Sequence, residues 1–284
     1  MAGDVNESSA PLAVEAPAPL VATPPRSERA RTTVYRLRFG IVYVVLAAVV
    51  GTAVGTFIVL ATSPDKAPVA DWSSWRPDGD ASRDAAAKQI ADHVSKAYRL
   101  PSGRQLAAVL VGPPVVQGVS VRAIAVRPDT STGQAEEGDI AITDAGNSMM
   151  FILCGLGQSC SIDEGRASLE RHQLLRREAL ELSLYTFKYV KDVDSVTVFL
   201  PPNPAAPKAA GTSVFLKQRD VRDELRAALS KTLTAPVTPG IGEIASVEGG
   251  TIDRITRQRT YSYEFQAAQD GTAFLVLTPV VLGS

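Results

Sequence analysis

The longest hydrophobic run in this chain has no polar interruption. Residues 39–62, FGIVYVVLAAVVGTAVGTFIVLAT, contain no charged side chain. A helix of this length reaches about 35 Å at about 1.5 Å per residue, which exceeds the roughly 30 Å of a bilayer's hydrocarbon core. A cleaved signal peptide has a shorter apolar core, of about 7–15 residues. The pattern therefore predicts a single transmembrane helix over residues 39–62.

The two flanks of this run differ in charge. The basic residues that precede it are Arg26, Arg29, Arg31, Arg36 and Arg38. A single acid, Glu28, lies among them, whereas the basic residues within 63–78 are offset by aspartates. Because positive charge is retained on the cytoplasmic side, we expect the N-terminus in the cytoplasm and residues 63–284 outside it. The predicted location is the cell membrane, with a single pass.

One face of the apolar run carries small residues. Gly51 and Gly55 are four residues apart, and Ala47 lies one step earlier on the same helical face. Small residues at this spacing allow two membrane helices to approach closely. The lipid bilayer is thus an expected partner, and a homodimer through Ala47, Gly51 and Gly55 is a second.

Four regions follow from the changes in composition. Residues 1–38 are rich in Ala and Pro without periodicity, which predicts a disordered cytoplasmic tail before the 39–62 helix. Residues 63–80 form a juxtamembrane linker whose two tryptophans fit either the membrane interface or a docked position on the domain. Residues 81–284 form the extracytoplasmic domain, and the Pro-rich stretch 201–211 is an alternative boundary within it.

Within residues 81–284 the apolar positions recur with helical or strand periods. Helical spacing is found over 81–100, 168–190 and 219–233. Strand-like runs are 104–112, 119–128, 139–143, 148–154, 195–202, 212–217, 259–267 and 273–282. The predicted fold class is an N-terminal single transmembrane helix followed by a mixed α/β (α+β) extracytoplasmic domain, with about three helices and eight strands.

The 168–190 segment has the clearest helical pattern, with Ser168 as N-cap. We expect a narrow charged stripe on it, containing Arg177 and Glu181, to face water. Together with the runs 148–154 and 195–202 it predicts a βαβ crossover. The turn formers DAGN between 139–143 and 148–154 predict a hairpin.

Both cysteines of the chain lie in one short segment. Cys154 and Cys160 enclose GLGQS, whose glycines let the backbone close a small ring. Outside the cytoplasm, such a pair forms a structural disulfide, with a stabilisation of about 2 kcal/mol for so short a loop. A redox pair and half of a metal site are the alternatives; the first usually needs Cys-x-x-Cys, and the second needs about four ligands.

Composition and motifs exclude several functions. The exported part carries 24 Lys and Arg against 26 Asp and Glu, a net charge of −2, which argues against nucleic-acid binding. The two histidines, His93 and His172, have no neighbour at metal-ligand spacing, and no nucleophile elbow or phosphate loop is present. We therefore expect no catalytic residue, cofactor or metal.

These observations favour a membrane-anchored extracytoplasmic binding or scaffolding module of the cell envelope, whose partner is an unknown envelope protein or polymer. The alternatives are a carboxylate-dependent enzyme that acts on the cell wall and a single-pass sensor. A cleft lined by paired acids would favour the enzyme. The sensor would need a recruited partner, because its cytoplasmic tail is short.

The disulfide prediction can be tested in cells. A thiol-alkylating reagent is expected to leave Cys154 and Cys160 unlabelled in the exported protein until a reductant is added, because the compartment outside the cytoplasm is oxidising. Mass spectrometry of the recovered chain measures the labelling. Full labelling without reductant would rule out both the disulfide and the oxidising compartment.

Overall fold

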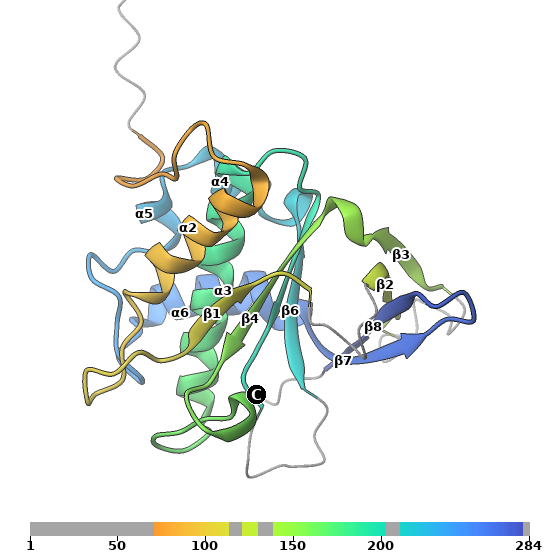
Figure 1. Ribbon diagram of the computed structural model, residues 1–284. Helices are drawn as coiled ribbons and strands as arrows, with labels where there is room; N and C mark the ends of the chain where they lie inside the picture. Colours follow the sequence, from red (N-terminus) through yellow and green to blue (C-terminus); the bar gives the residue numbers. More distant parts are fainter. Residues whose placement is uncertain (1–70, 114–120, 130–138, 203–210, 281–284) are drawn as a thin grey trace, which may run out of the picture. The chain divides into compact units, whose positions relative to one another are not determined.

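One mixed β-sheet runs through the computed structural model, which describes residues 71–113, 121–129, 139–202 and 211–280 (Figure 1). Its strands are β1 (Ala108–Val111), β2 (Val121–Val126), β3 (Ala141–Asp144), β4 (Ser148–Cys154), β5 (Ser195–Phe199), β6 (Thr212–Lys217), β7 (Thr260–Ala267) and β8 (Ala273–Pro279). Their order across the sheet is β1-β4-β5-β6-β7-β8-β2-β3. The pairs β4–β5 and β2–β8 are parallel, and the other five are antiparallel.

A very short link makes this sheet coil. β4 is second and β3 is eighth in the strand order, so six strand spacings separate them. In a flat sheet that would be about 29 Å, at about 4.8 Å per spacing. Only the 3-10 helix η2 (Ala145–Asn147) joins β3 to β4, and four peptide steps of about 3.8 Å span at most about 15 Å. The half of the sheet that contains β2 and β3 must therefore curl back toward the start of β4.

The helices cover one face of the β4–β5–β6 half of the sheet (Figure 1). The five α-helices of the described residues are α2 (Arg83–Ser95), α3 (Leu169–Tyr189), α4 (Arg222–Arg226), α5 (Leu229–Thr232) and α6 (Ser246–Thr256). Alternate strand residues such as Phe151, Val198 and Leu216 pack against them and are fully or almost fully buried. The long helix α3 joins the parallel strands β4 and β5, so the predicted βαβ crossover and its Ser168 N-cap are confirmed.

A second core lies on the opposite face of the sheet. It contains Met150, Phe199 and Phe215 from the first half of the sheet, together with Ile124 and Leu275 from the second half. The alternation of strand residues explains it, since neighbouring residues point to opposite faces. All five residues of β5 are buried, as expected for a strand covered on both sides.

The fold class predicted from the sequence is wrong as stated. It combined a transmembrane helix over 39–62 with a domain of about three helices, whereas the described residues contain five α-helices. No helix in the described ranges is both long and apolar enough to cross a membrane. Residues 39–62 themselves lie outside those ranges. The mixed sheet of eight strands is the part that the structure supports.

Two local predictions also need correction, and one helix was not predicted. The expected hairpin between 139–143 and 148–154 does not form, because β3 pairs with β2 while β4 pairs with β1 and β5. The single helix expected over 219–233 is divided into the 3-10 helix η4 (Gln218–Val221), α4 and α5. Helix α6 was not predicted from the sequence, because Gly249 and Gly250 disfavour a helix. At Gly249 a Cβ would lie 3.0 Å from Gln173 Nε2 of α3, so a larger residue there would require that side chain to shift.

The charged stripe of α3 is buried in its middle, contrary to expectation, while its ends Glu170 and Lys188 are exposed as expected. The side chain of Arg177 is 3% exposed and that of Glu248, on α6, is 0% exposed. Arg177 Nε donates to Glu248 Oε1 at 2.6 Å. On its other side, Arg177 Nη1 donates to the hydroxyl oxygen of Tyr98 at 2.6 Å and to Glu181 Oε2 at 3.2 Å. The middle of the stripe thus faces the loop after α2 and helix α6 rather than water.

Another buried carboxyl, Glu178 of α3, has no hydrogen-bond partner within the described residues. Glu178 is 0% exposed, and neither of its oxygens forms a hydrogen bond within the described residues. Burial raises the pKa of Glu178 well above its ordinary value, and the Glu181 carboxylate adds to the rise. Glu248 differs, because its Oε2 accepts hydrogen bonds from the Thr234 hydroxyl and the Ala235 backbone N–H.

This contrast predicts opposite effects on stability. Glu248→Ala is expected to lower the free energy of unfolding by about 3–5 kcal/mol, because it leaves Arg177 buried without its main counter-ion. Glu178→Met is expected to leave it unchanged or raise it, because an unpartnered polar group is removed. Urea unfolding measures both.

The exposed carboxylate Glu264 provides the control, since its ion pair with Arg127 is on the surface. Glu264→Ala should change the free energy of unfolding by less than about 1 kcal/mol. A Glu248→Ala variant as stable as this control would contradict the importance of the buried pair.

Candidate functional site

The segment before α2 is docked on the domain by its two tryptophans. Trp72 is buried, and its Nε1 donates to the Glu224 carbonyl oxygen at 3.3 Å. Its ring meets the Tyr185 ring edge-on at 5.3 Å between centroids. Trp75 stacks on the His93 ring at 3.9 Å, with 4° between the planes. Of the two positions left open by the sequence, the structure thus shows the docked one.

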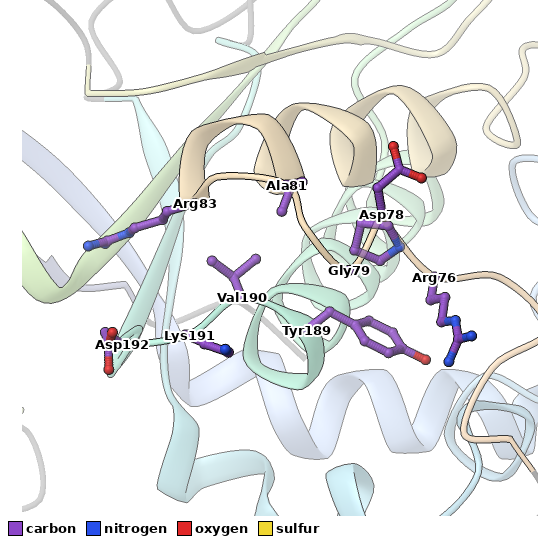
Figure 2. A pocket seen from close by; sticks show the side chains of 11 residues that line it. Arg76, Asp78, Gly79, Ala81, Arg83, Tyr189, Val190, Lys191 and Asp192 are labelled. Atoms are coloured by element: carbon purple, nitrogen blue, oxygen red, sulfur yellow. The ribbon is translucent and has the colours of Figure 1, made fainter.

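This docking builds one wall of a cleft (Figure 2). The cleft has a volume of about 680 Å³ and lies between residues 76–86 and residues 189–192, where α3 ends. Its floor is apolar and contains the buried residues Pro77, Ala86 and Val190. We call it the α2–α3 cleft.

Charged side chains surround the floor of the α2–α3 cleft. Arg76 and Lys191 are exposed and form no ion pair within the described residues. Tyr189 lies beside Arg76, and burial raises the pKa of its phenol. Asp78 is held in place by Gln89, whose Nε2 donates to Asp78 Oδ2 at 2.8 Å. The rim can therefore offer two cations and a phenol to a ligand, next to the exposed carboxylate of Asp192, which also lines the cleft.

Arg83 of the same cleft has a structural role. Its Nη1 donates to the Gly146 carbonyl oxygen at 2.6 Å and its Nη2 to that of Ser148 at 2.8 Å. Gly146 lies in the short link between β3 and β4, and Ser148 is the first residue after it. Arg83 thus connects the start of α2 to the segment that coils the sheet.

The predicted disulfide is present. Cys154, the last residue of β4, is bonded to Cys160 with 4.4 Å between their Cα atoms. Gly155 is required for this small ring, because a Cβ on it would lie 2.0 Å from the Ser161 carbonyl oxygen. Neither cysteine lines a pocket described here, so the pair acts as a structural link at the end of the strand.

Other predicted residues lie outside the described ranges. These are the helix-packing set Ala47, Gly51 and Gly55 and the topogenic set Arg26, Arg29, Arg31, Arg36 and Arg38. Their roles, and the homodimer and bilayer contacts inferred from them, stay predictions.

Both histidines are packed rather than free. His172 is partly buried on α3, and burial, with the nearby Arg176 charge, lowers its pKa to about 4 despite the opposing charge of Asp253. His93 lies against Trp75, and burial lowers its pKa as well, with Lys96 adding to the effect. In the described ranges, no group of three or more His, Cys, Asp and Glu is placed to hold a metal ion.

Comparisons with protein-family models, with curated proteins and with solved structures gave no match. Function must therefore be inferred from the site itself.

Sequence reasoning missed the α2–α3 cleft. The two walls are separated by about a hundred residues in the chain, and no local motif connects Arg76 with Lys191. The two tryptophans were the available signal, since large aromatic residues in a short linker indicate that the linker can dock.

The pKa of His172 predicts a pH dependence of stability. The unfolded chain binds a proton near the ordinary pKa of 6.5, whereas the folded chain does so only near about 4. Below pH 6.5 the unfolded state therefore binds more protons, and stability is lost as the pH falls toward 4. The loss attributable to this group is up to about 3 kcal/mol.

His172→Gln should flatten this part of the stability curve, measured by urea unfolding between pH 4 and 7. His93→Gln is the matched control. It should flatten the stability curve less, because the pKa of His93 is lowered less than that of His172. Equal slopes in the wild type and in His172→Gln would contradict the assignment.

Proposed function

We propose that this chain is an extracytoplasmic binding or scaffolding module of the cell envelope, and that its partner, an envelope protein or polymer, docks at the α2–α3 cleft. The observation that carries the proposal is the cleft itself: an apolar floor flanked by Arg76 and Lys191, two exposed cations without carboxylate partners in the described residues. Free cations next to apolar surface and a phenol suit recognition of a partner with acidic and apolar groups.

The disulfide supports the proposed location. Structural disulfides persist in oxidising compartments and are rare in the cytosol. The bond between Cys154 and Cys160 closes a small ring and lines none of the described pockets, so a structural role fits it better than a redox role.

The arrangement of carboxyl groups favours binding over catalysis. A carboxylate enzyme needs an acid with a raised pKa inside its cleft. The carboxyls whose pKa burial raises, Glu178 and Glu181, are on α3 and do not line the α2–α3 cleft. Two carboxyls do line it: Asp78 is already bonded to Gln89, and Asp192 lies exposed on the opposite wall, just after α3.

The proposal predicts position-specific crosslinking in cells. A photo-crosslinking amino acid placed at Lys191 of the full-length chain should capture one envelope partner, identified by mass spectrometry. The same amino acid at Lys231, an exposed residue of α5 outside the cleft, should not capture that partner.

A charge test follows in the same cells. With the crosslinker moved to Gly79, an exposed cleft residue with open space for a side chain, the combined change Arg76→Glu and Lys191→Glu should reduce the captured partner about fivefold or more, because two attractive charges become repulsive. Lys231→Glu should leave capture unchanged. Equal capture in all three proteins, or recovery of the chain alone, would overturn the proposal.

A further inference from the structure

A second hollow lies at the end of the sheet where β6 stops and β7 begins. It consists of two depressions of about 330 and 450 Å³. Lys217 and Arg219 line both of them, so the depressions adjoin. We call the pair the basic hollow.

Coiling of the sheet creates the first depression. Its lining includes Val126 of β2 and Ala141 of β3 together with Phe215 of β6 and Tyr261 of β7. β2 and β3 are not neighbours of β6 in the strand order. They reach this place only because the second half of the sheet curls back. The depression therefore has walls from both halves and a partly aromatic surface.

Positive charge is concentrated in the basic hollow. The cations that line its two depressions are Lys217, Arg219, Arg222, Arg226 and Arg259, and the acids are Asp194 and Asp220. Five cations against two acids give a local charge of +3. The region from residue 63 onward has 24 basic and 26 acidic residues, a net of −2, so the charge of the hollow is a local excess.

One of the two acids of the hollow, Asp220, is already neutralised. Asp220 Oδ2 lies 3.2 Å from Arg259 Nε and accepts a hydrogen bond from the Lys217 backbone N–H at 2.9 Å. Arg219 and Arg222 are exposed and form no ion pair within the described residues. Their guanidinium groups are available to an external anion.

We infer that the basic hollow binds a flexible chain that carries several phosphate groups. Arginine matches phosphate well, because its planar fork can donate two parallel hydrogen bonds. Two adjoining depressions that share cations suit repeated anionic groups better than a single ion. The Phe215 and Tyr261 walls can contact the uncharged parts between them.

The concave shape decides between a polymer and a lipid surface. A flat bilayer contacts side chains that protrude from a protein surface. Here several of the cations line depressions instead. A thin polymer chain can enter such a hollow. This inference does not depend on the α2–α3 cleft, which shares no residue with the basic hollow.

The test is a binding titration of the purified full-length chain with a fluorescently labelled linear polyphosphate. The wild type is expected to bind it, and excess inorganic pyrophosphate to compete. Affinity should fall severalfold between about 50 mM and about 200 mM salt, because phosphate contacts release counter-ions. The double change Arg219→Glu and Arg222→Glu should weaken binding about tenfold or more.

A matched control separates a local site from total charge. Lys88→Glu with Lys96→Glu changes the net charge by the same amount, on exposed positions of α2 and its C-cap. Affinity close to that of the wild type is expected for this control. An equal loss in both double variants, or no binding of polyphosphate by the wild type, would overturn the inference.

Phosphatidylglycerol vesicles are the last ligand to be compared in this experiment. If they bind the wild type through Arg219 and Arg222 while polyphosphate does not, the hollow recognises a lipid surface and the polymer inference is wrong. Thermal unfolding of each variant confirms that it is folded, so that lost binding cannot be attributed to lost structure.

Discussion

Three residues between β3 and β4 constrain the whole sheet. Because Ala145–Asn147 is far too short to cross six strand spacings, the sheet can form only if it coils. The coil brings together the residues of the second core, which contains Phe199 and Phe215. It also places β2 and β3 opposite β6, which creates a wall of the basic hollow. Arg83 holds the carbonyl groups of the same link and so ties α2 to this geometry.

Local signals account for what could be predicted. The strand runs, the α3 crossover and the disulfide follow from apolar periodicity, from Ser168 and from two cysteines separated by glycines. Strand pairing could be predicted only in part: the crossover gives the β4–β5 pair, but the DAGN turn indicates a hairpin of β3 with β4, and only the tertiary coil decides against it. The double glycine at 249–250 hid α6; Gly249 approaches Gln173 of α3 closely, which no single segment reveals, whereas Gly250 has open space around it. The residues of both candidate binding surfaces come from distant segments, so no motif marks them.

Charge has two separate uses in this domain. Inside, Arg177 is enclosed by acceptors from α3, α6 and the loop after α2. It is therefore buried, although the helical periodicity of α3 assigns it to a face exposed to water. At the surface, Arg76, Lys191, Arg219 and Arg222 have no carboxylate partner in the described residues. Surface cations contribute little to stability. Their arrangement in two hollows is therefore better explained by recognition than by folding.

The hydrogen bonds of Glu248 have a consequence for local motion. The segment between α5 and α6 has little regular secondary structure, which usually permits local opening and fast amide exchange. Here its Thr234 and Ala235 donate to the same carboxylate that holds Arg177. Opening the segment would expose a buried charge pair, so we expect the amide of Ala235 to exchange as slowly as the amides of the core helices.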